Sequence, residues 1–163
     1  MGDKINQNKS GLAGEFAVMS RLFRNDYDVS FTFGNTKSFD IFASKDSKTF
    51  RIEVKTSSSM DKQYGEKSAW GKHCAWPVGT KILDRDCNNL FYAFVWLPKE
   101  EDKEKPDYQY IFIVKGEDVV KYIKESSKKA KEKGLTSDYF LRIGNGPDVL
   151  SWEKHFNKFE LLK

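Results

Sequence analysis

Two kinds of hydrophobic spacing alternate along this chain, one typical of helices and one typical of strands. Between residues 10 and 25, apolar side chains recur three or four positions apart, at Leu12, Phe16, Met19 and Phe23. This spacing predicts a helix with one apolar face, which Ser10 is suited to cap. Shorter segments rich in β-branched and aromatic residues predict strands, at 29–33, 38–43, 50–54, 90–97, 108–114 and 139–143.

The second half of the chain adds helices to these strands. Residues 116–133 predict a helix whose first half turns apolar side chains inward and whose second half is polar all round, and residues 151–162 form a last amphipathic segment. Residues 57–89 show no clear period, so this stretch is predicted to be functional or to contain short elements. The order of elements predicts one α/β domain over residues 1–163, with a central mixed sheet flanked by helices.

The amino-acid composition indicates a folded domain but does not by itself indicate a function. The length of 163 residues suits one domain, and the aromatic fraction of 15% argues for a packed core. The net charge of +4 permits a polyanionic partner but does not demand one. No apolar run resembles a signal peptide or a membrane span, so we expect a cytoplasmic protein. Cys74 and Cys87 are then expected to be free thiols, and His73 beside Cys74 lacks the further ligands of a zinc site.

The segment from Ser38 to Lys55 carries the pattern of an antiparallel hairpin with its turn at Asp46 and Ser47. In that register the pairs on one side are all apolar: Ala43 with Phe50, Ile41 with Ile52, and Phe39 with Val54. The pairs on the other side are Phe42 with Arg51, Asp40 with Glu53, and Ser38 with Lys55. A slip of one residue would scramble the two faces, whereas a slip of two would preserve them, so the register is a hypothesis.

The predicted register sets two carboxylates against each other. Asp40 and Glu53 would lie with their side chains about 5 Å apart, and like charges in that position are destabilising. A divalent cation bound by both is the simplest counter-charge, and carboxylate oxygens suit Mg²⁺ or Mn²⁺. Lys55 follows on the same face of the strand and supplies a cation that can position or polarise a water. This set matches the needs of phosphodiester hydrolysis, in which a metal neutralises the phosphate and acidifies a bound water.

These residues resemble the active-site motif of the PD-(D/E)xK nuclease superfamily, which has the restriction-endonuclease-like fold. Asp40 matches the first acid of the motif, and Glu53 and Lys55 match its (D/E)xK. Phe39 stands where the motif's name has proline, a position that varies in the superfamily. Many members add a glutamate on the first helix, and Glu15 in GLAGEFAVMSRLF matches that position. The resemblance implies a DNA endonuclease that binds Mg²⁺ or Mn²⁺ through Asp40, Glu53 and Glu15, with Lys55 completing the catalytic set.

The irregular segment after the candidate strand is our prediction for the DNA-facing surface. Its lysines could contact phosphates, and its aromatic residues could stack on bases. We predict that four residues of this segment bind nucleic acid: Lys62, Lys67, Lys72 and Trp70. Lys37, which lies before the candidate strand, is added to this set. For the aromatic residues of this segment, Tyr64, Trp70 and Trp76, packing against the sheet is the interpretation we favour.

Other readings stay open at the level of sequence. Asp40, Glu53 and Lys55 could be the solvated face of an amphipathic hairpin, and the fold could serve as a non-catalytic nucleic-acid-binding or protein-interaction module. Half of a toxin–antitoxin pair is a third reading, which no sequence feature favours or opposes. A homodimer would supply two sites for cutting two strands, and a second protein could supply target recognition. The sequence decides neither point, nor does it tell DNA from RNA or give a target sequence.

Overall fold

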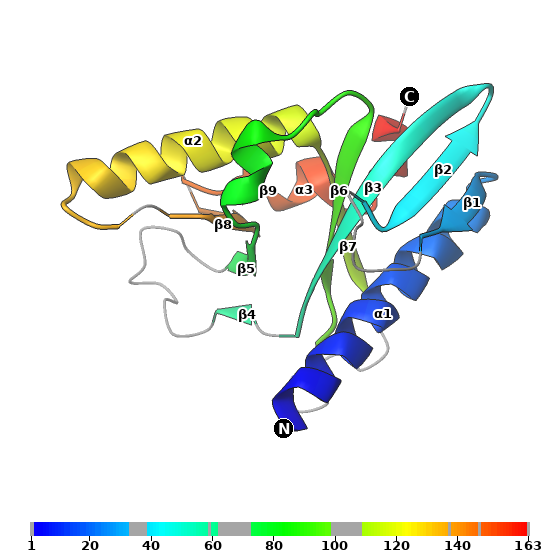
Figure 1. Cartoon of the computed structure of the whole chain (residues 1–163), viewed down its shortest axis with the longest axis horizontal. Helices are drawn as coiled ribbons and strands as arrows, with labels where there is room; N and C mark the ends of the chain where they lie inside the picture. The colour runs from blue at the N-terminus through cyan, green and yellow to red at the C-terminus, as the bar shows by residue number, and fades with distance from the viewer. Residues whose placement is uncertain are drawn as a thin grey trace.

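The chain folds around a five-stranded sheet with a smaller four-stranded sheet beside it (Figure 1). The computed structural model describes residues 2–32, 39–58, 60–61, 73–98, 109–136, 138–146 and 148–162. The strand order of the larger sheet is β1-β2-β3-β6-β7, and that of the smaller sheet is β4-β5-β8-β9. The larger sheet holds antiparallel and parallel pairs, so the predicted mixed α/β architecture is confirmed.

The first three strands form an antiparallel meander, consisting of β1 (Asp28–Phe31), β2 (Ile41–Lys45) and β3 (Lys48–Ser57). The β2–β3 hairpin turns at Asp46 and Ser47, which both adopt positive φ angles. Ile41 pairs with Ile52, Phe42 with Arg51, and Ala43 with Phe50, as the hydrophobic pattern predicted. The predicted register of the hairpin is therefore confirmed from its turn as far as Ile41.

Strand β6 (Leu90–Trp96) lies in the interior of the larger sheet, and every one of its residues is buried. It pairs in parallel with β3 and antiparallel with β7 (Tyr110–Lys115). Burial on both faces explains why its sequence is a continuous apolar run instead of an alternating one. Its odd-numbered residues join the core under α1, and its even-numbered residues join the core under α2.

Helix α1 (Gly2–Phe23) starts earlier than predicted and buries a different face. The side chains in the core are Ala17, Val18 and Leu22, whereas Phe16 is 59% exposed and Phe23 55%. The predicted apolar face of this helix is therefore wrong. Small residues let the helix approach β3 closely: a Cβ added at Gly14 would lie 1.9 Å from the hydroxyl oxygen of Thr56. Close backbone approach outweighs side-chain size in choosing the buried face here.

Two of the four strands of the smaller sheet come from residues 57–89, the segment that showed no period. It contains β4 (Met60–Asp61) and β5 (His73–Pro77), followed by the 3-10 helix η1 (Thr80–Asp84). β5 pairs with β8 (Phe140–Gly144), which pairs with β9 (Leu150–Ser151). Trp76 is fully buried, and its indole N–H donates to the carbonyl of Val95 at 3.0 Å. Its packing role is confirmed, because it joins the two sheets.

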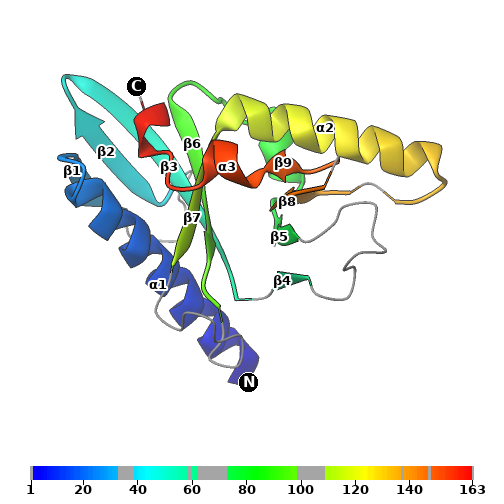
Figure 2. The same ribbon diagram turned by 180° about the vertical axis from the view of Figure 1, so that it is seen from behind.

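The two α-helices of the second half of the chain lie on the face of the larger sheet opposite α1 (Figure 2), whereas Phe159 near the C-terminus joins the core under α1. Helix α2 (Gly116–Glu132) matches its prediction, with Val119 and Ile123 buried. The predicted amphipathic segment at the C-terminus is shorter than one continuous helix: it forms α3 (Trp152–His155) and the 3-10 helix η3 (Phe159–Leu161). Among the described residues, no helix combines the length and the apolar character that crossing a membrane requires.

Candidate active site

Strand β3 uses its two faces for different purposes. Ile52 and Val54 point into the core under α1, so Glu53 and Lys55 project from the opposite face. The Lys55 ammonium lies 2.6 Å from Oε1 of Glu53, and the two side chains are 31% and 16% exposed. The predicted pair of acid and lysine is thus brought together as a partly buried ion pair on one face of one strand.

Asp40 lies immediately before β2 and contacts β3 on both sides of Glu53. Its backbone N–H donates to the carbonyl of Ile52 at 3.0 Å, and its Oδ2 accepts the backbone N–H of Val54 at 2.8 Å. The regular ladder ends at Ile41, so the predicted direct pairing of Asp40 with Glu53 needs correction. A short aspartate side chain competes with backbone carbonyls for strand N–H groups, and this competition ends the ladder. The Asp40 carboxylate still binds the peptide N–H of Val54, the residue directly after Glu53.

Glu15 lies on the helix that packs against β3 on the face opposite Glu53 and Lys55. It lies on α1, next to the Gly14 that contacts Thr56 of β3. Its side chain is half-buried, with the Oε2 atom fully buried. The part of Glu15 in the site stays a prediction.

The structure adds Arg85, a residue that sequence reasoning missed. Arg85 follows η1, and its guanidinium forms an ion pair with Oε2 of Glu53. The same guanidinium nitrogen, Nη1, donates to the hydroxyl of Tyr92 at 3.0 Å. Tyr92 is the neighbour of Glu53 across the parallel β3–β6 pair. Nothing in the sequence around Arg85 sets it apart from the other charged residues of this segment, because the contact depends on the tertiary fold.

Burial and charge act against each other in this cluster. Burial alone would lower the pKa of the Arg85 guanidinium, but its hydrogen bond with Glu53 and the charge of that carboxylate raise the pKa overall. Burial raises the pKa of the Tyr92 hydroxyl to about 12, and the charge of Glu53 acts in the same direction. Tyr92 is therefore a neutral hydrogen-bond acceptor for Arg85 at neutral pH, and Arg85 is a permanent cation.

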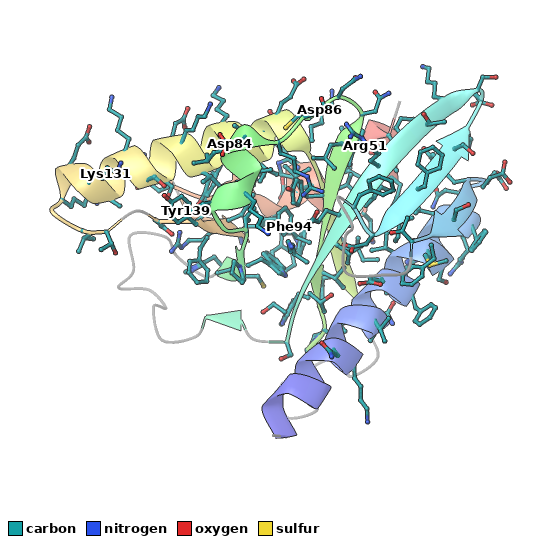
Figure 3. The ribbon with its side chains drawn as sticks, viewed as in Figure 1. Arg51, Asp84, Asp86, Phe94, Lys131 and Tyr139 are labelled. Atoms are coloured by element: carbon teal, nitrogen blue, oxygen red, sulfur yellow. The ribbon has the colours of Figure 1, made fainter. Side chains whose placement is uncertain are left out.

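A second ion pair holds the same segment against β3. Arg51, two residues before Glu53 on the same face, contacts Asp86 at 2.8 Å (Figure 3). The backbone N–H of Asn88 and the Arg51 guanidinium lower the pKa of the Asp86 carboxyl. The Asp86 side chain is 69% exposed, so this pair contributes little to stability and serves mainly to position residues 85–89.

The donor set suits a hard divalent cation. Asp40, Glu53 and Glu15 offer carboxylate oxygens, which are the ligands that Mg²⁺ and Mn²⁺ prefer. As the side chains stand, no three acidic, histidine or cysteine groups of the described residues are gathered closely enough to hold a metal ion. The oxygens of Glu53 instead contact Lys55 and Arg85. The carboxylates present are therefore suitable ligands for a divalent cation. For Glu53 to bind one, its contacts with Lys55 and Arg85 must be replaced by contacts with the metal.

The five residues predicted to bind nucleic acid cannot be compared with the structure. They are Lys37, Lys62, Lys67, Lys72 and Trp70, and all lie outside the described residues. Ser38, the predicted partner of Lys55 in the hairpin, lies outside them as well.

Comparison with known proteins supports the reading of the fold and of the N-terminal half. Residues 5–70 match the sequence family described as PD-(D/E)XK endonuclease, a range that includes Glu15, Asp40, Glu53 and Lys55. The structure of a bacterial homing endonuclease, I-Ssp6803I, is similar at a TM-score of 0.56 and 10% identity, over 95% of this chain and 90% of that one. At this identity the likeness shows the fold alone. No curated protein matches the chain in sequence. The predicted resemblance is confirmed: residues 5–70 match the PD-(D/E)XK endonuclease family, and the chain has a fold like that of a restriction-endonuclease-like homing endonuclease.

Proposed function

We propose that this chain is a metal-dependent endonuclease that hydrolyses phosphodiester bonds of DNA. The proposal rests on one observation. Glu53 and Lys55 form an ion pair on β3, and the carboxylate of Asp40 accepts the N–H of Val54, which lies between them in the strand. Two acids that can hold a divalent cation, with a lysine beside them, suit metal-assisted hydrolysis of a phosphodiester. The family match of residues 5–70 supports the reaction class.

In this proposal each residue has a distinct task. Asp40 and Glu53 hold Mg²⁺ or Mn²⁺, and Glu15 completes or orients the metal ligands from α1. When bound, the metal supplies charge neutralisation at the phosphate and an acidified water. Lys55 holds its ammonium beside Glu53, where it can orient the attacking water and stabilise negative charge as it develops on the phosphate oxygens.

The test is cleavage of supercoiled plasmid and of a branched synthetic DNA, each with Mg²⁺, with Mn²⁺ and with EDTA. We expect metal-dependent cutting that falls by about 10²–10³-fold in Lys55→Ala, the usual cost of removing one electrostatic stabiliser of the transition state. Asp40→Asn and Glu53→Gln should lose cutting together with metal binding. Lys48→Ala is the matched control, because Lys48 is an exposed lysine at the start of the same strand.

One observation favours a second function, a non-catalytic binding module on the same fold. Both carboxylate oxygens of Glu53 contact positively charged side chains of the protein itself. The same contacts are expected in an ion-pair network that only stabilises the fold. Thermal melting distinguishes the two functions. A nuclease site predicts that Mn²⁺ raises the melting temperature of the wild type and not of Asp40→Asn. Absence of both cutting and Mn²⁺ stabilisation would contradict the nuclease proposal and favour the binding module.

A further inference from the structure

Arg85 couples the candidate site to a part of the chain that the family match does not include. It lies between η1 and β6, beyond residues 5–70, and its side chain is 20% exposed. Its guanidinium contacts the Glu53 carboxylate and the Tyr92 hydroxyl, and its carbon atom Cζ lies 5.9 Å from the centre of the Tyr92 ring. The guanidinium is thus held in one place by an acid, a hydroxyl and an aromatic ring.

The two oxygens of Glu53 have separate cationic partners. Oε1 contacts the ammonium of Lys55 at 2.6 Å, and Oε2 contacts the guanidinium of Arg85. A divalent cation coordinated by Glu53 would meet positive charge at both oxygens, and like charges at such short range in a partly buried site repel strongly. Metal binding therefore requires at least one of the two protein cations to move away.

The two cations differ in how they are attached. Lys55 lies two residues from Glu53 on the same rigid strand, so its Cα position relative to the acid is fixed by β3. Arg85 comes from outside the sheet, at the end of a 3-10 helix of five residues. It also lines an open surface pocket of about 530 Å³ between η1 and α2, together with Lys121 and Glu117. Arg85 therefore borders open space, whereas Lys55 is attached to the sheet itself.

We propose that Arg85 is the counter-cation of the metal-free site, which a divalent cation displaces from Oε2 of Glu53, and that the freed guanidinium then binds the phosphodiester beside the metal. A guanidinium presents paired N–H donors whose geometry matches two phosphate oxygens, so the displaced group has a chemically suitable second partner. Arg85 then weakens metal binding in the absence of DNA and strengthens DNA binding in the presence of metal. This inference rests on the proposed function, because it assumes that Glu53 is a metal ligand.

The experiment is a calorimetric titration with Mn²⁺ in the absence of nucleic acid, followed by steady-state cleavage of plasmid DNA. Arg85→Met should bind Mn²⁺ about tenfold more tightly, the size expected when one charge-assisted hydrogen bond no longer competes for the carboxylate. The same variant should cleave DNA with a raised KM. A residue that only supports the fold would weaken both metal binding and cleavage, so the opposite signs identify the proposed role.

Arg142→Met is the matched control, since Arg142 forms a similarly buried ion pair with Asp138, at 2.6 Å, outside the candidate site. It should bind Mn²⁺ as the wild type does. Tyr92→Phe removes the hydroxyl that holds Arg85 and should tighten Mn²⁺ binding by a smaller factor. This milder variant decides the question if Arg85→Met does not fold.

The outcomes separate this inference from the proposed function. If the wild type binds Mn²⁺ and cuts DNA, but Arg85→Met and Tyr92→Phe bind Mn²⁺ with unchanged or lower affinity, the role of Arg85 is wrong and the nuclease proposal stands. If the wild type neither binds Mn²⁺ nor cuts DNA, the nuclease proposal fails and the role of Arg85 fails with it. Tighter Mn²⁺ binding with an unchanged KM overturns the phosphate-binding half of the inference.

Discussion

The contact between Gly14 of α1 and Thr56 of β3 makes a quantitative prediction about helix docking. A Cβ added at Gly14 would lie 1.9 Å from the Thr56 hydroxyl oxygen, whereas ordinary van der Waals contact begins at 3.4 Å. Gly14→Ala therefore forces α1 and β3 apart by about 1.5 Å at this point unless Thr56 moves. Glu15 is the next residue of the helix, so the same displacement would shift a proposed metal ligand.

The expected loss of stability follows from two opposing effects. Inserting a methyl group into a packed interface costs about 1–3 kcal/mol, and the severity of this overlap favours the upper end of that range. Alanine is better than glycine inside a helix by about 1 kcal/mol. Gly14→Ala should thus lower the free energy of unfolding by about 2 kcal/mol. Urea denaturation monitored by tryptophan fluorescence measures this difference directly.

A double-mutant cycle with Thr56→Ala isolates the contact from other effects of the glycine. The Thr56 hydroxyl is buried and makes no hydrogen bond with the described residues, so its removal should cost little as a polar group. Without that hydroxyl the nearest remaining atom is the Cβ of Thr56 at 3.0 Å, which a small shift relieves. Gly14→Ala in the Thr56→Ala background should be close to neutral, giving a coupling energy of about 2 kcal/mol. Additive effects within about 0.5 kcal/mol would refute the contact.

Two further predictions concern ionisable groups away from the candidate site. Burial acts to raise the pKa of the Asp138 carboxyl, but hydrogen bonds from Arg142 and the Phe140 N–H outweigh it and lower the pKa below 3.8. A lowered folded-state pKa gives stability that is present above the unfolded value and lost as pH falls through the folded value. The stability gap between wild type and Asp138→Asn should therefore narrow from pH 5 to pH 2 in urea denaturation, and a constant gap would contradict the ion pair. Burial raises the pKa of the Cys74 thiol to about 12, so in a Cys87→Ser variant a thiol reagent should label Cys74 only as fast as the protein unfolds; faster labelling in the native state would show that Cys74 is accessible.

The hairpin was predictable because its turn and its alternating pattern constrain each other. Only one register near the turn puts Ile41 against Ile52 and Ala43 against Phe50, and the structure has that register. Asp40 lies at the point where the side chain can take over from the backbone as hydrogen-bond acceptor. Periodicity carries no information about that competition, so the end of the ladder was predicted incorrectly.

The orientation of α1 shows a different limit of pattern reading. The helix carries two apolar stripes, one of large residues including Phe16 and one of small residues including Ala17 and Val18. Hydrophobicity favours the first stripe, but only the second lets the helix approach β3 as closely as Gly14 does. Arg85 was beyond prediction for a related reason, because its partner Glu53 lies 32 residues away in the chain. Contacts between elements depend on the assembled shape, which the sequence pattern of one element does not contain.

The order of strands in the larger sheet has a consequence for how the protein is made. β3 lies beside β6 in the sheet, but the smaller-sheet strands β4 and β5 and the helix η1 come between them in the chain. During synthesis from the N-terminus, Asp40 and Glu53 therefore leave the ribosome before Arg85 and before β6, the strand that pairs with β3. Parallel pairing across such an insertion closes a long loop and is slow compared with hairpin formation. Until β6 docks, the nascent chain presents the acidic pair with Lys55 but without Arg85, so the finished ion network belongs to the late stage of folding.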